Sequence, residues 1–366
     1  MDYPKRLQRL RRSMAARKLD AVLIRQPDNR RYLSGYTAPD HGIAETSGLL
    51  LILRKGPSYL LTDFRFREQA ENETDGYEVL LYFDDSLKLL QKLVFDHGLN
   101  SLGFESDYTL HSNAESLFDL GGTLSVDMVP LTGFVERLRL IKSEEEIERI
   151  RRSVRLNEQV FQNVFNALKD TGTELDIALE IETEMRRHGA EGAAFATIVA
   201  SGAATSLPHA VPGRRKLARN APVVIDMGLI LEGYCSDMTR SFAFGTADKK
   251  YTKLHRLVRQ AQLAGMAAVR AGVSGREVDS AARQVLADAG YGEYFGHALG
   301  HGVGIAVHEQ PRVSSKNRKK LKPGMVITIE PGLYIPGWGG IRLENMVVVR
   351  EDGCENLNSD TTWLDI

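Results

Sequence analysis

The sequence predicts two domains, an α/β domain followed by an α+β domain whose sheet is mainly antiparallel. The chain has 366 residues, which is more than one ordinary hydrophobic core accommodates. Its first third alternates helix-like and strand-like patterns, and the remainder combines long helical patterns with two strand-rich stretches punctuated by turns. The α/β pattern ends near residue 130, before a long charged helix that begins at residue 143, so we predict domains 1–132 and 133–366.

The first domain opens with a basic amphipathic segment, residues 3–20, in which Leu7, Leu10 and Met14 recur at helical spacing. An organelle transit peptide has a similar composition, but this segment leads into a strand-like run without a cleavage site, so we expect a folded helix. Strand-like runs follow at 21–24, 48–54, 58–63, 78–83, 101–106 and 124–130, with a helical stretch at 86–98. Strands separated by helices are typical of an α/β domain.

The second domain begins with a predicted helix over 143–170, where Ser143 and Glu146 have the spacing of a capping box. Its buried stripe is formed by Ile147, Ile150, Val154, Val160 and Val164. Further helices are predicted over 173–189, 251–272 and 275–290, the last capped by Ser274. The strand-rich stretches are 221–245 and 325–349, which favours an antiparallel or mixed sheet.

The bulk composition excludes several classes of partner. Charged residues make up 26% of the chain, yet the formal net charge is −1, so nothing electrostatic favours nucleic acid or an anionic membrane. No apolar run approaches the ~20 residues that span a bilayer. Two cysteines cannot form a disulfide scaffold, which indicates a reducing compartment. We therefore expect a cytoplasmic protein with no nucleic-acid or membrane partner.

Two acidic residues interrupt the first strand-rich stretch. Asp226 and Asp237 flank a turn near Leu231–Gly233. If the turn centres on residues 231–232, the two carboxylates are directly opposite, and if it centres on 232–233 they are diagonal neighbours. Either register puts both on one face, where like charges repel unless a cation lies between them. The alternative is a pair that faces solvent.

The second strand-rich stretch repeats this feature with Glu330 and Glu344, although the long connection makes their pairing less certain. Upstream, "GHALGHGVGIAVHE" (296–309) places three histidines among glycines. Four carboxylates and one imidazole suit Mn²⁺, Co²⁺ or Fe²⁺ better than a closed thiolate zinc site. Four carboxylates also exceed the needs of one ion, which favours a pair of ions sharing bridging ligands.

The motifs "IDMG…CSDMTR", "GHGVGIAVHE", "TIEPG" and "IRLEN", in this order, resemble those of the pita-bread metallopeptidases, the clan of methionyl aminopeptidases, aminopeptidase P and prolidase. "FATIVASGAATSLPHA", "RLRLIKSEEEIERIRRS", "NRRYLSGY" and "LLTDFRFREQA" are similar to segments of the Xaa-Pro branch, so the likeness covers essentially the whole chain. It implies a curved, mainly antiparallel sheet with outer helices in the second domain.

The resemblance also implies roles for individual residues. Asp226 would bind the first metal ion, Asp237 and Glu344 would bridge both ions, and His301 and Glu330 would complete the second. The implied cofactor is two divalent ions per subunit, with Mn²⁺ favoured and Co²⁺, Fe²⁺ or Zn²⁺ as alternatives. Glu330 would in addition transfer the proton of the attacking water.

Four further residues match positions around the substrate. His209, His308 and Arg342 would surround the reacting carbonyl, and His297 would line the pocket for proline. Each also has a plainer interpretation: His209 as a turn residue, His297 as packing, and Arg342 as a partner of Asp237 or Glu344. Asn345 departs from the pattern, because an Asp often follows the last bridging Glu, and an amide supplies a hydrogen bond without charge.

The function predicted from this resemblance is hydrolysis of the Xaa-Pro bond at the N-terminus of short peptides, in the manner of an Xaa-Pro aminopeptidase. The alternative is an Xaa-Pro dipeptidase, or prolidase, restricted to dipeptides. A methionyl aminopeptidase is disfavoured because that group usually lacks the leading domain. A metal-free creatinase-like amidinohydrolase and a non-catalytic binding module are remote, since all five ligands are present. The resemblance further implies a homodimer.

Overall fold

The computed structural model describes residues 1–168 and 172–366. These form two compact units, Met1–Arg139 and Leu140–Ile366. Within the described residues, no helix combines the length and the apolar character that a bilayer-crossing segment needs.

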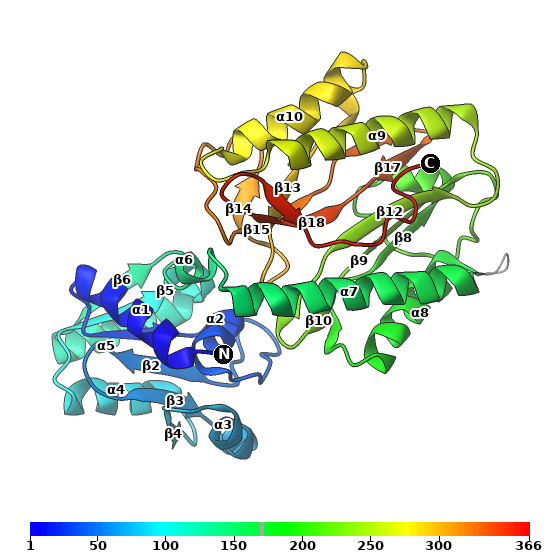
Figure 1. The fold of residues 1–366 in the computed structure, drawn as a ribbon. Helices are drawn as coiled ribbons and strands as arrows, with labels where there is room; N and C mark the ends of the chain where they lie inside the picture. The colour runs from blue at the N-terminus through cyan, green and yellow to red at the C-terminus, as the bar shows by residue number, and fades with distance from the viewer. Residues whose placement is uncertain (169–171) are drawn as a thin grey trace. The chain divides into compact units, whose positions relative to one another are not determined.

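The first unit is built on one six-stranded sheet with the order β4-β3-β2-β1-β5-β6 (Figure 1). Its strands are β1 (Ala21–Ile24), β2 (Leu49–Leu53), β3 (Ser58–Thr62), β4 (Glu78–Leu81), β5 (Ser101–Glu105) and β6 (Asp127–Leu131). The neighbours of β2 are antiparallel to it, whereas the pairs β3–β4, β1–β5 and β5–β6 are parallel. The α/β prediction is confirmed, with a mixed sheet.

Helices cover this sheet and account for its buried residues. They are α1 (Tyr3–Ala16), α2 (Pro27–Ser34), α3 (Arg67–Glu73), α4 (Ser86–Asp96), α5 (His111–Leu124) and α6 (Glu136–Arg139), with 3₁₀ turns η1 (Phe64–Phe66) and η2 (Ser106–Tyr108). The N-terminal segment is a folded helix, as predicted, and it buries Leu7, Leu10 and Met14. Side chains of α4 and α5 pack with β1 and β2 in one hydrophobic cluster.

Four long helices of the second unit lie on two sides of its strands (Figure 1). They are α7 (Glu144–Ala167), α8 (Glu174–Arg187), α9 (Lys249–Ala268) and α10 (Gly275–Asp288), with 3₁₀ turns η3 (Gly202–Ser206) and η4 (Gly292–Tyr294). The predicted capping box at Ser143 is present, and the predicted cap Ser274 also forms a capping box, with Glu277. The predicted end of the first of these helices, at residues 169–170, lies outside the described residues.

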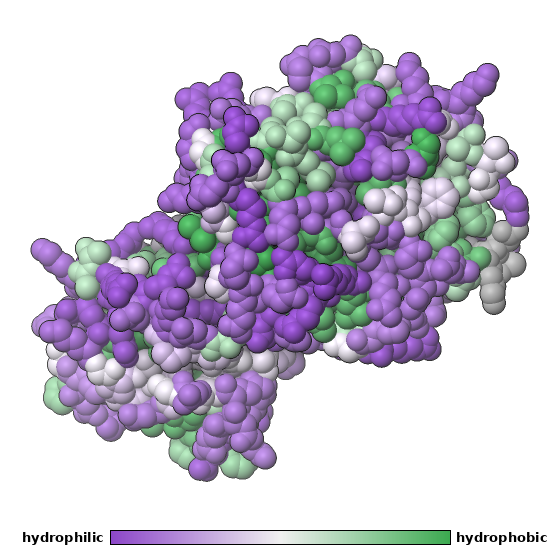
Figure 2. Space-filling view, in the orientation of Figure 1, coloured by the Kyte–Doolittle hydropathy of each residue, from purple (hydrophilic) through white to green (hydrophobic). Residues whose placement is uncertain are grey.

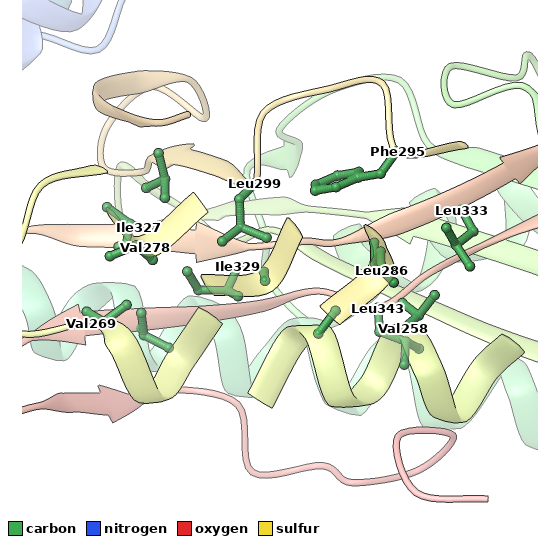
Figure 3. Close-up of a cluster of buried hydrophobic side chains, with 14 of the residues drawn as sticks. Val258, Val269, Val278, Leu286, Phe295, Leu299, Ile327, Ile329, Leu333 and Leu343 are labelled. Atoms are coloured by element: carbon green, nitrogen blue, oxygen red, sulfur yellow. The ribbon is translucent and has the colours of Figure 1, made fainter. Parts of the chain in front are cut away.

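Each helix pair buries its apolar face against strands. One cluster joins α9 and α10 to the strands of the last hundred residues, with Val258, Leu286 and Ile329 among its members (Figure 3). A second cluster joins α7 and α8 to the strands around Ile225 and Phe242. The opposite face of α7 is hydrophilic, as the sequence pattern requires (Figure 2).

The strands of the second unit form four small sheets. The strands are β7 (Gly192–Ala193), β8 (Ile198–Ser201), β9 (Pro222–Met227), β10 (Leu229–Leu231), β11 (Tyr234–Cys235), β12 (Met238–Ala243), β13 (Gly300–Gly302), β14 (Glu309–Val313), β15 (Val326–Ile329), β16 (Gly332–Ile335), β17 (Gly339–Arg342), β18 (Asn345–Val349) and β19 (Cys354–Asn356). The sheet orders are β12-β9-β8, β11-β10-β7, β14-β13-β15-β18-β19 and β16-β17, and every pair is antiparallel. The predicted antiparallel α+β domain is confirmed.

The first acidic pair lies on an interrupted hairpin. Strands β9 and β12 pair in the same register as β10 and β11, which are joined through Glu232 and Gly233. Both turn residues have positive φ, +49° and +80°, as a type I′ turn requires. Asp226 pairs with Thr239, so Asp237 is its diagonal neighbour. This is the second of the two registers considered from the sequence.

The second acidic pair lies on a hairpin of the same design. Strands β15 and β18 pair through Ile329 and Asn345, and β16 and β17 continue this register through Gly332 and Arg342. Glu330 and Glu344 therefore stand opposite each other in the gap between the two ladders. The long connection is ordered by the short ladder of β16 and β17.

Candidate active site

All nine residues singled out from the sequence line one cavity of about 570 Å³. Five are the acids and the histidine with metal-ligand character: Asp226, Asp237, His301, Glu330 and Glu344. The other four are His209, His297, His308 and Arg342. Asp237, Glu330 and Glu344 lie at the hairpin interruptions. Asp226 lies near the end of β9 and His301 in the middle of β13, so residues more than a hundred positions apart converge.

Backbone hydrogen bonds fix the interrupted positions. Glu330 N donates to Leu299 O at 2.8 Å, and Glu344 N donates to Thr239 O at 3.1 Å. The second of these bonds joins the two hairpins directly beside Asp226, because Thr239 is its cross-strand partner. The acids are thus held by main-chain contacts outside their own ladders.

Asp237, His301 and Glu344 each place a ligand atom within 4.8 Å of the other two. His301 Nε2 lies 3.6 Å from Asp237 Oδ2 and 3.4 Å from Glu330 Oε1. Its Nδ1 lies 3.1 Å from Gly302 O, a contact that places the ring proton on Nδ1. The Nε2 lone pair is then directed at the carboxylates, which is the orientation of a metal-ligating imidazole.

Burial makes this cluster of acids costly while no cation is bound. Burial, together with repulsion from Glu344 and Asp226, raises the pKa of Asp237 well above its usual value. Burial and repulsion by Glu330 likewise raise the pKa of Glu344, and burial raises the pKa of Glu330 to about 8. Burial lowers the pKa of His301 to about 4, so its ring is neutral. A cation would replace the protons of the acids, and the neutral imidazole could bind it directly.

The donor set fits a divalent metal ion. Asp226 Oδ1 is buried, and among the described residues nothing donates a hydrogen bond to it. A buried carboxylate oxygen without a donor is costly unless a cation binds it. Four carboxylates with one imidazole nitrogen match the preferences of hard to borderline divalent ions.

Arg342 forms an ion pair with the other carboxylate oxygen of Asp226. Its Nη2 lies 2.6 Å from Asp226 Oδ2, its Nε donates to Thr239 Oγ1, and its Nη1 donates to Tyr334 Oη at 2.7 Å. Of the partners considered from the sequence, Asp237 and Glu344, neither forms an ion pair with it among the described residues. Tyr334 Oη in turn lies 2.9 Å from His297 Nε2, so His297 is connected to the acids through Tyr334 and Arg342.

Three hydroxyl residues that the sequence did not single out support the site. Thr239 donates to Glu344 Oε2 at 2.7 Å, Thr328 donates to Glu330 Oε1 at 3.1 Å, and Tyr334 joins Arg342 to His297. The two threonines had a signal, since each lies two residues from a predicted ligand on the same face of a strand. Tyr334 lies in a turn-rich connection, where no sequence pattern pointed to it.

Other polar residues complete the surroundings of the cavity. The His308 ring packs edge-on against His301 with 4.3 Å between ring centroids. Arg312 lines the same cavity. Asn345 is fully buried and donates to Asn356 Oδ1 at 3.1 Å, while its own Oδ1 accepts no hydrogen bond from the described residues.

Enzymes that hydrolyse bonds with two metal ions gather buried carboxylates in this way, and the fold and the cavity place the protein among metal-dependent hydrolases. The chain belongs to Metallopeptidase family M24, which it matches over residues 148–351. Residues 6–141 match the Creatinase/Prolidase N-terminal domain. The predicted pita-bread fold and the assignment to its Xaa-Pro branch are confirmed, and the protein is a peptidase.

Relatives named for different activities are about equally similar to the chain. The chain is 34% identical to an Xaa-Pro dipeptidase of Pyrococcus horikoshii over 346 residues, covering 94% of each chain. Among solved structures, an Xaa-Pro dipeptidase from Bacillus anthracis has a TM-score of 0.91 at 34% identity and 98% coverage of both chains. An X-Pro aminopeptidase from Thermotoga maritima has a TM-score of 0.87 at 35% identity, covering 95% of this chain and 98% of that one.

Proposed function

We propose that this protein hydrolyses the bond between the first residue and proline in short peptides, in the manner of an Xaa-Pro aminopeptidase. The observation that carries the proposal is the convergence of Asp226, Asp237, His301, Glu330 and Glu344 on one cavity that also holds three further imidazoles. Relatives named for Xaa-Pro bonds support the same substrate class.

The five ligand-type residues would hold two divalent ions, for which Mn²⁺ is our first choice and Co²⁺, Fe²⁺ and Zn²⁺ are alternatives. When bound, such ions polarise a carbonyl group and lower the pKa of water toward neutrality. Asp226 would belong to one ion, His301 and Glu330 to the other, and Asp237 and Glu344 to both.

The chain's own residues would bind the peptide and move protons. Glu330 accepts the proton of the attacking water and delivers it to the departing prolyl nitrogen, which has no hydrogen of its own. His308 and His209 donate to the carbonyl oxygen as negative charge develops there. His297, held by Tyr334, forms a wall of the proline pocket, and burial lowers its pKa to about 4, so its ring is uncharged.

One observation favours the second candidate, an Xaa-Pro dipeptidase. Arg312 lines the cavity, and no described carboxylate forms an ion pair with its guanidinium. A dipeptide ends in the prolyl carboxylate, which an uncommitted guanidinium would bind with two hydrogen bonds. A longer peptide has an amide at this position and would gain less.

The experiment that separates the two candidates compares Leu-Pro with Leu-Pro-Gly after loading with Mn²⁺. An aminopeptidase cleaves the tripeptide at least as well as the dipeptide, and a dipeptidase cleaves Leu-Pro alone. With Arg312→Gln, a dipeptidase loses about 10-fold or more in kcat/KM for Leu-Pro, as expected for a lost charged contact. Hydrolysis of neither peptide would contradict the proposed substrate class.

The metal proposal has its own test. Asp237→Ala removes a proposed bridging carboxylate, so we expect it to abolish turnover and to lower the bound metal below two ions per chain in elemental analysis. Its far-ultraviolet circular dichroism should match that of the wild type, because Asp237 lies outside the hydrophobic clusters. Full activity of this variant would contradict the bridging role. The homodimer and the cytoplasmic location stay predictions, and light scattering tests the first.

A further inference from the structure

Two loops carry the histidines proposed to face the substrate carbonyl, and each loop contacts a buried glutamate that the proposed mechanism does not use. Glu309 contacts the loop between Gly302 and His308, and Glu174 contacts the loop between Ser201 and Gly213 that carries His209. Neither glutamate lines the cavity.

Glu309 binds its loop at two points. Glu309 pairs with Gly302 across strands β14 and β13. Its Oε1 also accepts a hydrogen bond from Ala306 N at 3.1 Å. Its carboxylate packs so closely on Gly304 that a Cβ there would lie 2.7 Å from Oε2. The backbone leading to His308 is therefore folded around this one carboxylate.

A buried lysine compensates the charge of Glu309. Lys142 Nζ lies 3.2 Å from Glu309 Oε2, and the side chains of the two residues are only 2% and 7% exposed. Lys142 N also donates to Gly324 O at 2.9 Å, which fixes its backbone just before α7. A buried pair of this kind adds little net stability, but removal of one partner leaves a buried charge and is costly.

Glu174 binds both ends of the other loop. It is fully buried at the first position of α8, where the helix dipole favours a negative charge. Its Oε1 accepts from Ser201 N at 2.9 Å, and its Oε2 accepts from Gly213 N at 3.0 Å. Arg215 adds a salt bridge at 2.8 Å. The Glu174 side chain therefore bridges the two ends of a segment whose eleven intervening positions include His209, beside the backbone bond from Leu175 N to Gly213 O.

We propose that Glu309 and Glu174 are positioning residues for catalysis, each holding one substrate-facing histidine, His308 and His209 respectively, at the distance that the transition state requires. This inference rests on the proposed function. Its physical basis is that a loop that loses a hydrogen bond to its backbone shifts the histidine it carries, and a displacement of ~1 Å can cost about 100-fold in rate.

Substitution by glutamine tests the role of the carboxylate at both positions. It has the shape of glutamate but only one accepting oxygen, so in Glu174→Gln one of the two loop ends faces an N–H group instead of an acceptor. In Glu309→Gln the amide group meets either Ala306 N–H or the Lys142 ammonium. The control is Glu158→Gln, because Glu158 is also buried and accepts from Ser359 N and Asp360 N in a segment without site residues.

The first readout is kinetic, in the Mn²⁺-loaded enzyme with Leu-Pro or Leu-Pro-Gly, whichever is cleaved. Glu309→Gln and Glu174→Gln should each lower kcat by about 10- to 100-fold and change KM by less than about twofold, since the histidines act on the transition state. Glu158→Gln should leave kcat within about twofold. Lys142→Met added to Glu309→Gln removes the unpaired ammonium and should restore part of kcat.

Double variants distinguish positioning from general destabilisation. In a His308→Ala background, Glu309→Gln should have no further effect on kcat, whereas Glu174→Gln should keep its full effect. In a His209→Ala background the pattern should be reversed. Effects that multiply equally in both backgrounds, or an unchanged kcat in the single variants, would overturn the inference.

Amide hydrogen exchange gives a readout that is independent of activity. Glu309→Gln should accelerate exchange in a peptide containing Ala306, and Glu174→Gln should do so in peptides containing Ser201 and Gly213. Local acceleration in a protein that cleaves neither peptide would refute the proposed function while supporting the holding of the loops. Unchanged exchange in both variants would refute the inference itself.

Discussion

Glu330 illustrates how the site couples metal to protons. Its carboxyl has a pKa of about 8 because it is buried, and burial also raises those of Asp237 and Glu344. At pH 7 the metal-free site therefore holds protons that a divalent ion must displace. The acids can bind a metal ion only when they release these protons.

Metal binding should accordingly release protons, and the apparent affinity should rise with pH. We expect calorimetric titration of metal-free protein with Mn²⁺ at pH 7, in buffers of different ionisation enthalpy, to show release of one or more protons. The release should be smaller at pH 9, above the pKa of Glu330. A release that is absent at pH 7 would show that the acids are already ionised.

A change at Tyr334 tests the link between His297, which we propose lines the proline pocket, and the acids. Its hydroxyl group joins Arg342 to His297, and burial raises its pKa to about 12, so it remains a donor across the physiological range. Tyr334→Phe removes both contacts and should lower the free energy of unfolding by about 1–2 kcal/mol. We expect kcat/KM to fall about tenfold, measured beside urea unfolding. A variant with full activity would make Tyr334 structural only.

The four acids could be predicted because each interrupts or ends an apolar, strand-like run. His301 could be predicted because it lies among glycines and its order with the acids matches a known set of motifs. Tyr334 could not, since its position depends on the short ladder of β16 and β17 within a turn-rich connection. The partner of Arg342 was also undetermined, because cross-strand geometry alone does not say which of several nearby acids a long side chain reaches.

Hairpin interruptions form the frame of the site. At the first, the chain passes so close to its partner that a Cβ on Gly228 would lie 2.2 Å from Ser236 O and 2.6 Å from the Phe195 ring. Contacts below 3.0 Å with backbone cannot be relieved by a side-chain rotation. Only glycine fits at this break between β9 and β10.

Gly228→Ala should therefore displace Asp237, which follows Ser236 directly, and destabilise the protein by about 3 kcal/mol or more. The matched control is Gly122→Ala on α5, where nothing lies within 4 Å of the added Cβ. That change should stabilise its helix by ~1 kcal/mol. Urea unfolding of the two variants measures both effects, and an equal response would contradict the steric argument.

Helices with side-chain caps were the easiest elements to predict. The capping box at Ser143 and the cap at Ser274 appear where the sequence placed them. The helices α2 and α3 have only eight and seven residues, too few for an apolar period to be recognised. Helix α5 has no capping side chain and contains Gly121 and Gly122, and its last residue, Leu124, falls within the strand predicted at 124–130. That strand begins at Asp127, after Ser125 ends the helix in a left-handed conformation.

The stability of the second unit should depend on pH through His255. This residue is fully buried on α9, with its ring beside that of Tyr251, and burial lowers its pKa to about 4 from the usual 6.5. The unfolded chain takes up a proton as the pH falls through 6.5, but the folded protein does not until about pH 4. Stability that is fully present at pH 7 is therefore lost progressively over this window.

We expect wild type to lose about 2 kcal/mol between pH 7 and pH 5 relative to His255→Leu, at ~1.4 kcal/mol per pKa unit. Both tryptophans, Trp338 and Trp363, belong to the second unit, so their fluorescence during urea unfolding reports on it. The comparison with the variant removes the contribution of other titrating groups. Parallel pH profiles would show that folding does not lower the pKa of His255.

Domain class was predictable for the entire chain, because periodicity differs between its two parts. The mixed pairing of the first sheet was not, since a strand-like run does not reveal the direction of its neighbour. Similarly, the sequence left two registers open for Asp226 and Asp237, and the type I′ turn at Glu232 and Gly233 selects one.

The meeting of four carboxylates at two hairpin breaks has a consequence for adaptation. Such a cluster opposes folding whenever the metal is absent, so activity and robustness are in conflict at these positions. The hydrophobic clusters beneath the helices do not depend on the acids. A descendant protein that no longer needs catalysis would become more stable without metal if amides replaced these acids. The same fold could then serve a function that is not catalytic, such as binding.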